Sequence, residues 1–260
     1  DYHHVHLTAP DAEAAARSVQ AGTAVGTPKT QDGPVEMLRV LRVARQSALK
    51  ARTQAVNQFH SLVVTAPAPL RARLRCLALS QRIARAAAFR CDPALPTPLV
   101  ATKLALRSLA RRHRQLSAEI EVLDAQLAQV VARKAPQLLA VKGVGTDTAT
   151  ALLVATGDNP ERLRSEAAFA RLCGVAPIPA SSGQTTRHRL HRGGNRDANR
   201  ALYLLAVGRM GWDPRTQAYV ARRTAEGRSK PEIIRCLKRY LARELYPVLV
   251  GTPPRATVSP

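Results

Sequence analysis

Two long stretches with helical apolar spacing, separated by prolines, constrain the fold of this chain more than any other feature. Residues 34–64 start at Pro34 and stop before Pro67. Their apolar positions recur with the periodicity of one face of a helix: Met37, Leu38, Leu41, Ala48, Val56, Phe59 and Leu62. The opposite face is a basic stripe made of Arg39, Arg42, Arg45, Lys50 and Arg52. This pattern predicts a long amphipathic helix.

The second long stretch, residues 101–133, carries a heptad-like seam. Its apolar residues alternate at spacings of four and three: Leu116, Ile120, Leu123, Leu127 and Val130. Between the two stretches we expect one helical piece at about 70–90 and a linker with Pro93, Pro96 and Pro98. The two long helices are predicted to form the arms of an extended hairpin. Two heptads do not separate a dimerisation element from an intramolecular pair of core helices.

The composition favours a polyanionic partner. The 260 residues carry a formal net charge of +22, and the sequence pI is about 11.3. Nucleic acid is the usual partner of so basic a chain, with a ribosomal or membrane-surface role as the alternative. Aromatic residues make up only 3%, so we expect an aliphatic, mainly helical core. No apolar run approaches the roughly 18–20 residues of a membrane span.

The cysteines and the first residues bear on the compartment. Cys76, Cys91, Cys173 and Cys236 are too widely spaced for a zinc site, and their apolar or helical surroundings predict buried thiols. The opening DYHHVHLTAP contains no recognisable signal peptide. Without a disulfide framework or a targeting segment, we expect a cytoplasmic protein.

A glycine-containing corner follows Pro136. The run LLAVKGVGTDTA at 138–149 resembles a helix-hairpin-helix, with Gly143 and Gly145 in the turn. Glycines permit a tight turn and expose N–H groups at a helix N-terminus, where a phosphate can bind. A corner between two helices without any ligand is the alternative.

The most reactive-looking stretch is GVAPIPASSGQTTRHRLHRGGNRDANR at 174–200. It presents Ser181, Ser182 and Gly183 after a proline-rich turn, with His188 and His191 among the arginines that follow. Those arginines are Arg187, Arg189, Arg192, Arg196 and Arg200. Arginine binds phosphate in bidentate fashion and remains charged, so a serine here suits a phosphodiester substrate. An ordinary polar loop on a solvated basic face is the competing interpretation.

The remaining sequence predicts short helices at 199–210 and 214–224 and an amphipathic helix at 231–249. In the last of these, Tyr240 is assigned to the core face together with Ile233, Ile234, Leu237, Leu241 and Leu245. We divide the chain into a first segment at 1–33, a helical hairpin at 34–135, a C-terminal helical domain at 136–250 and a disordered tail at 251–260. The fold class is mainly α.

Several stretches together resemble the insertion-sequence transposases of the IS110, IS116 and IS902 family, also called DEDD transposases. They are LLAVKGVGTDTATALLVATGD, FARLCGVAPIPASSG, RHRLHRGGNRDANRALYLLAVGRM and RTQAYVARRTAEGRSKPEIIRCLKRYLARELY. The upstream runs DAEAAARSV and DGPVEMLRVLRVARQSALKARTQAVNQ also resemble this family. The resemblance therefore extends over nearly the whole chain.

The resemblance implies a RuvC-like domain of ribonuclease-H type that binds Mg²⁺, a coiled coil and a transposase domain with a serine nucleophile. By position, Ser182 is that serine, with Ser181 as the competing choice. Gly143, Gly145, Arg187, Arg189, Arg192 and Arg196 fall where the domain meets nucleic acid. The implied partners are DNA, a structured guide RNA and further copies of the chain, and no membrane.

The sequence departs from the family pattern at its acidic residues. The last two of the family's four metal ligands correspond to Thr8 and Asp11, and only Asp11 is acidic. Asp11 is therefore the single candidate metal ligand and acidic catalytic residue. We expect 1–33 to be a truncated RuvC-like remnant and the transposase to be impaired. The alternative is a noncatalytic nucleic-acid-binding remnant.

Overall fold

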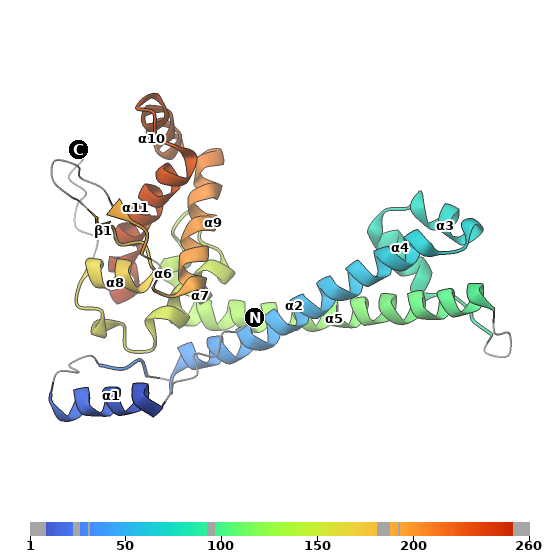
Figure 1. Cartoon of the computed structure of the whole chain (residues 1–260), viewed down its shortest axis with the longest axis horizontal. Helices are drawn as coiled ribbons and strands as arrows, with labels where there is room; N and C mark the ends of the chain where they lie inside the picture. Colours follow the sequence, from blue (N-terminus) through green and yellow to red (C-terminus); the bar gives the residue numbers. More distant parts are fainter. Residues whose placement is uncertain are drawn as a thin grey trace.

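The computed structural model describes residues 9–22, 27–30, 32–92, 97–180, 188–191 and 193–251. Almost all regular structure in these residues is helical, which confirms the mainly α fold class. Figure 1 shows two parts: a long helical arm and a cluster of helices at one end of it. We call these the arm and the helical domain. No helix of the described residues is long and apolar enough to cross a membrane.

The arm consists of two long helices that pack along each other. They are α2 (Pro34–Thr65) and α5 (Pro98–Lys134). Each begins with proline in its first turn, where no N–H partner is needed, and Thr97 also caps α5 by accepting a hydrogen bond from the Val100 nitrogen at 3.3 Å. Ile120 and Leu127 of the predicted seam are buried. The two helices therefore form an intramolecular pair, and self-association of the chain stays a prediction.

The far end of the arm has a small core of its own. Helix α3 (Ala68–Arg75) packs there against α2, and α4 (Leu79–Ala87) packs against α5 (Figure 1). The sequence predicted one helical piece in this region, which was wrong. A turn at 76–78 separates the two helices, and the Gln81 side chain accepts from the Ala78 nitrogen at 3.2 Å to start α4. The buried residues are Phe59, Val63, Ala66, Leu70, Leu74, Ile83, Ala86, Ala87, Leu106 and Ala110.

The helical domain is built around α7 (Thr146–Thr156), which is buried along most of its length. Helices α9 (Arg196–Trp212) and α11 (Lys230–Val250) supply much of the rest of the core. The remaining elements are α6 (Pro136–Leu139), the 3₁₀ turn η1 (Pro160–Arg162), α8 (Glu166–Leu172), α10 (Pro214–Ala225) and strands β1 (Ile178–Pro179) and β2 (His188–Arg189). The strands form an antiparallel pair that the sequence did not predict.

The root of the arm belongs to the core of the helical domain. Val35 and Leu38 of α2 join Leu127 and Val131 of α5 in the same buried cluster as the domain residues. One residue of the predicted basic stripe is also buried there: Arg42, assigned to the face opposite the apolar one, is only 8% exposed. That prediction was wrong because Arg42 Nη1 lies 3.0 Å from a carboxylate oxygen of Asp197, at the start of α9.

Two neighbouring contacts also tie the arm to the domain. Arg45 pairs with Asp124 of α5, and its Nη1 lies 3.4 Å from an oxygen of Asp147 in the first turn of α7. The backbone N–H of Val35 donates to Asp158 Oδ1 at 3.0 Å, just beyond the end of α7. The arm therefore meets the domain at the first turns of α7 and α9 and also just beyond the end of α7.

Three further residues lie elsewhere than predicted. Tyr240 is half-exposed although it was assigned to a core face, because its ring packs edge-on against Tyr219 at the surface. Met37 is likewise exposed. Of the four free thiols, Cys173 is buried, whereas Cys76 is exposed at the end of α3.

The described part of residues 1–33 contains helix α1 (Ala9–Gln20) and no strand. Thr8 and the Asp11 side chain lie outside the described residues. The RuvC-like origin of this segment stays a prediction, as does the disordered tail, since 252–260 are also outside the described residues.

The core at the far end of the arm predicts a sharp contrast between two leucines on α5. Leu106 is fully buried, whereas Leu104 is 47% exposed. We expect Leu106→Ala to lower the free energy of unfolding by about 2–5 kcal/mol, because it removes packed methyl groups and leaves a cavity. Leu104→Ala is the matched control and should change it by less than about 0.5 kcal/mol. Urea denaturation followed by circular dichroism measures both, and equal losses would contradict the distal core.

Candidate nucleic-acid interface

The segment that contains the predicted serine connects two paired strands. Ile178 of β1 is opposite Arg189 of β2, and Pro179 is opposite His188. Ser181, Ser182 and Arg187 lie in the connection between the strands, outside the described residues. The structure therefore places the ends of this connection and leaves the serine itself a prediction. Arg189 and His188 are exposed on β2.

Glycines hold the two ends of this hairpin in direct backbone contact. Gly174 has φ +64° and Gly194 has φ +121°, which side-chain-bearing residues rarely adopt. A Cβ on residue 194 would lie 2.7 Å from the Gly174 nitrogen. The Asn195 N–H donates to the Leu172 carbonyl at 2.7 Å beside this crossing. We call Gly174, Gly194 and Asn195 the hairpin clamp.

A chain of side-chain hydrogen bonds ties the clamp to α11. Asn199 Nδ2 donates to the carbonyls of Cys173 and Gly174 at 2.8 and 3.1 Å. Lys238 Nζ in turn donates to Asn199 Oδ1 at 2.9 Å, which fixes the orientation of the amide. Burial lowers the pKa of Lys238, and the charge of Arg235 lowers it further. Cys173 is fully buried, and burial raises the pKa of its thiol to about 12, which disfavours the reactive thiolate.

The sequence analysis missed Asn199 and Lys238 as site residues. Helical spacing alone gives no sign that Lys238 reaches an amide of another helix. The sequence does carry a signal for Asn195, because an asparagine that precedes a helix commonly caps it. Its Oδ1 accepts from the nitrogens of Asp197 and Ala198 at 3.0 and 2.9 Å.

The predicted arginines are distributed around the clamp. Arg196 and Arg200 lie exposed in the first turns of α9, and Arg189 lies exposed on β2. Arg192, like Arg187, is outside the described residues. Because the clamp joins β2 to the start of α9, the structure brings Arg189 and Arg196 to the same end of that helix. Asp197 does not oppose them fully, since it pairs with the buried Arg42.

The glycine corner between α6 and α7 has the expected turn. Gly143 has φ +91°, and Gly145 stands at the N-cap of α7, where no side chain caps the first turn. The N–H groups of that turn are thus available to a ligand. The corner packs against the second half of α9: a Cβ on residue 143 would lie 2.9 Å from Leu205 and 3.0 Å from Trp212.

Side chains around the corner fix it in place. Lys142 Nζ lies 4.5 Å from the centre of the Trp212 ring, a cation–π contact. Arg209 donates to the Lys142 carbonyl at 3.2 Å and pairs with Glu244 of α11 at 2.7 Å. Leu205 and Trp212 follow Arg196 by roughly 14 and 24 Å along the axis of α9. The structure therefore does not gather all predicted residues at one point, but places them along this helix.

The described residues do not provide a magnesium site. No group of three His, Cys, Asp or Glu side chains in the described part of the chain lies close enough together to hold a metal ion. The Asp11 side chain is not among those described. A hard cation needs several oxygen ligands in one place, so no chemical step can be assigned to a metal from these residues.

The hairpin clamp predicts an unequal response of two glycines to the same substitution. Gly194→Ala should lower the free energy of unfolding by about 1–3 kcal/mol, because alanine disfavours positive φ and its Cβ would collide with the Gly174 backbone. Gly227 also has positive φ, +76°, but a Cβ there meets nothing within 4 Å. Gly227→Ala should therefore lose about 1 kcal/mol or less. Thermal unfolding of both variants tests this, and equal destabilisation would argue against the close crossing.

Comparisons with known proteins agree with the sequence resemblance. Residues 135–221 match the family described as Transposase IS116/IS110/IS902 family. The chain is 37% identical over 116 residues to an uncharacterized 43.6 kDa protein of insertion element IS110 from Streptomyces coelicolor, and this covers 44% of the chain and 28% of that protein. It is 29% identical over 144 residues to an uncharacterized 42 kDa protein of insertion element IS900 from Mycobacterium paratuberculosis, which covers 54% and 36%.

The matched part is about a third of the length of these relatives. Within the chain, the family match begins at the root of the arm and ends in α10, so it contains the glycine corner, the hairpin clamp and α9. These matches agree with the resemblance found in the sequence: residues 135–221 are similar to the transposases of the IS116/IS110/IS902 family.

Proposed function

We propose that the chain is a DNA-binding transposase of an insertion sequence that transfers DNA strands through Ser182. The observation that carries this proposal is the family match, because it spans both strands of the hairpin that contains Ser182. The basic composition, with a net charge of +22, supports a nucleic-acid substrate. Family resemblance further supports a structured guide RNA and self-association as parts of the same function.

In the proposed reaction, the Ser182 hydroxyl attacks a DNA phosphorus. An oxygen–phosphorus bond to the serine forms, the bond to the leaving sugar oxygen breaks, and the serine proton passes to solvent or a neighbouring base while the leaving oxygen takes up a proton. The clamp and the Lys238–Asn199 hydrogen bond hold the ends of the hairpin. In this proposal the exposed Arg189 and Arg196 bind the phosphate oxygens, where their charge also stabilises the transition state.

A noncatalytic nucleic-acid-binding role is the second candidate. The observation that favours it is in the sequence: Thr8 stands where the family pattern has an acidic metal ligand. This candidate retains the basic surface around the clamp and the glycine corner and omits the serine chemistry. The two candidates agree about binding and differ only in whether a covalent link to DNA forms.

The serine step predicts a covalent protein–DNA adduct. The chain would be incubated with end-labelled DNA of the element junction, Mg²⁺ and RNA transcribed from the flanking region of the element. We expect a labelled band that survives denaturation, and we expect Ser182→Ala to abolish it, because the phosphoserine link needs that hydroxyl.

Ser181→Ala is the matched control, since it removes the neighbouring hydroxyl from the same segment. If Ser181→Ala removed the adduct and Ser182→Ala kept it, the assignment of the nucleophile would be wrong. If the parent chain bound DNA and formed no adduct, the noncatalytic candidate would be favoured.

Arg189, on β2, and Arg196, in the first turn of α9, are predicted to make a salt-dependent contribution to DNA binding. Each phosphate contact contributes about 0.9 to the slope of log affinity against log salt concentration. Arg189→Gln with Arg196→Gln should therefore lower the magnitude of this slope by about 2. Fluorescence anisotropy with labelled DNA over a salt series measures it. Arg164→Gln with Arg228→Gln removes the same charge from exposed positions elsewhere in the domain, and a change of the same size there would contradict the proposed contact.

A further inference from the structure

The positive charge of the arm is concentrated at its far end. Residues 66–114 carry eleven lysines and arginines and a single acidic residue, Asp92. The rest of the arm is nearly balanced: residues 115–134 have two basic and three acidic side chains, and residues 32–65 have five basic and two acidic. We call the described part of residues 66–114 the basic tip. It lies outside the matched transposase domain and far from it in Figure 1.

Helix α5 contributes a regular stripe to the basic tip. Lys103, Arg107, Arg111 and Arg114 follow at spacings of four, four and three, which puts them on one face of the helix. Arg107 donates to the Phe89 carbonyl at 3.2 Å, and Arg111 donates to the Ala87 carbonyl at 3.4 Å. These bonds hold the C-terminal end of α4 beside the stripe.

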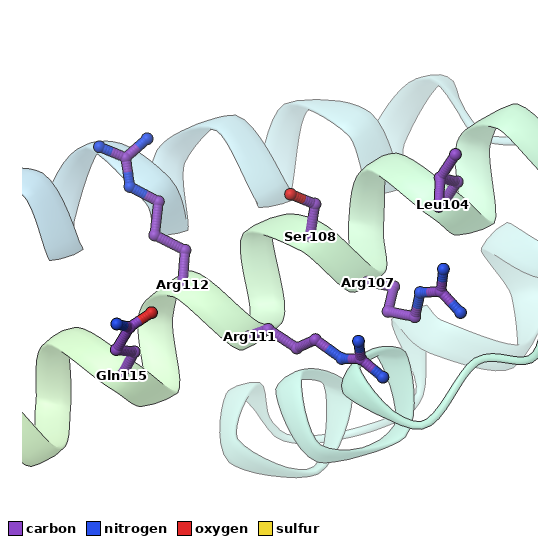
Figure 2. Close-up of a pocket in the computed structure, with 6 residues that line it drawn as sticks. All are labelled: Leu104, Arg107, Ser108, Arg111, Arg112 and Gln115. Carbon is purple, nitrogen blue, oxygen red and sulfur yellow. The ribbon is translucent and has the colours of Figure 1, made fainter.

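The hydrogen bonds to the Ala87 and Phe89 carbonyls also bring Arg85 and Arg90 near the stripe, because these two arginines flank the carbonyls in sequence. An open pocket adjoins the stripe (Figure 2). It is lined by Leu104, Arg107, Ser108, Arg111, Arg112 and Gln115. In Figure 2, Arg107 and Arg111 extend toward the α3–α4 side of the helix, whereas Arg112 extends away from it. Cationic side chains therefore lie on two sides of α5 in this part of the arm.

Only some arginines of the basic tip form hydrogen bonds that stabilise the fold. Arg71, Arg82, Arg107 and Arg111 all donate to backbone carbonyls. Arg73, Arg85, Arg90, Arg112 and Arg114 are exposed, and none of their side chains has a hydrogen bond or ion pair within the described part of the chain. Crowded like charges destabilise a fold, so a polyanionic ligand would relieve a repulsion among those five exposed arginines, which have no acidic partner among the described residues.

The shape of the tip selects the kind of polyanion. From Lys103 to Arg114 the stripe runs about 16 Å, which is the rise of about five nucleotides along one strand of a duplex. A single phosphate would occupy only a fraction of it. Proteins that hold single strands stack bases on exposed aromatic rings, whereas the only aromatic residue besides histidine in 66–114 is the half-buried Phe89. The features fit a double helix bound through its backbone.

We propose that the basic tip binds the phosphate backbone of duplex DNA, as a second contact separate from the transposase domain. This inference rests on the proposed function, since DNA is the polyanion on which a transposase acts. The arm helix α2 is about 48 Å long, so the tip reaches DNA well beyond the segment that lies at the hairpin clamp. It contributes affinity without reading base sequence, because backbone contacts position a duplex rather than identify it.

The test is binding of the full chain to a duplex long enough to reach from the domain to the tip, measured by anisotropy over a salt series. The tip variant is Arg85→Gln with Arg90→Gln and Arg114→Gln, which spares the arginines that bond to α4. We expect about tenfold or greater loss of affinity and a fall of about 2–3 in the magnitude of the salt slope. The melting temperature should remain that of the parent chain.

A matched variant carries the same charge loss away from the tip: Arg133→Gln with Arg164→Gln and Arg228→Gln, all exposed. A loss as large in this variant would mean that only total charge matters and would overturn the proposal. Parent-like binding by the tip variant would also overturn it and leave the proposed function intact. Failure of the parent chain itself to bind duplex DNA at low salt would instead refute the proposed function.

Photo-cross-linking locates the contact and identifies the nucleic acid. A photoreactive residue in place of Gln81 of α4 should cross-link duplex DNA, whereas the same residue in place of exposed Gln126, in the balanced part of α5, should not. Structured RNA of equal length serves as competitor. If position 81 cross-linked RNA in preference to DNA, the assignment of the tip to duplex DNA would be wrong.

Discussion

The structure depends above all on the way the root of the arm is packed into the helical domain. Val35, Leu38, Leu127 and Val131 are nearly inaccessible there and form one core with the domain. Burial of apolar surface supplies most of the free energy of such a joint. The Arg42–Asp197 pair fixes the orientation of α2 relative to α9 more than it adds to stability. Removing the guanidinium from water offsets much of its attraction to the carboxylate. Losing Asp197 would nevertheless leave a nearly buried charge unpaired.

This joint connects the arm to the parts of the domain that carry the candidate site. Arg42 contacts the first turn of α9, which begins at the hairpin clamp, and Arg45 contacts the first turn of α7, which begins at the glycine corner. A shift of the arm would therefore act on both places. The clamp has its own support from α11 through Lys238 and Asn199. The connection that contains Ser182 thus starts and ends on backbone held by three separate elements: α8, α9 and α11.

Much of the fold could be predicted from sequence, because long helices carry a strong periodic signal. The arm helices and the last two helices of the domain were predicted with ends close to those observed. The turn at 76–78 was missed, since no glycine or proline marks it and Gln81 caps α4 through its side chain. Arg42 was misplaced because periodicity assigns a face to a residue without knowing which acidic partner another helix brings to it. Tyr240 was misplaced for the related reason that an amphipathic ring can end at a surface.

The sequence identified which residue types belong to the candidate site, but it did not show how they are arranged in space. Motif order identified the family and the positions of the glycines and arginines, but not the clamp, which depends on the contact of Gly174 with Gly194. These residues lie far apart in sequence, and only the fold brings them together. The concentration of basic residues at the tip was already visible in the sequence. That these residues lie far from the domain became clear only from the structure of the arm. The helical pair of the arm holds the basic tip at a fixed distance from the basic surface around the hairpin clamp. A flexible linker of equal charge would not fix this distance. Binding at both surfaces then constrains the path of one duplex relative to the hairpin, so the arm can orient DNA at the site without any contact to the reacting bond.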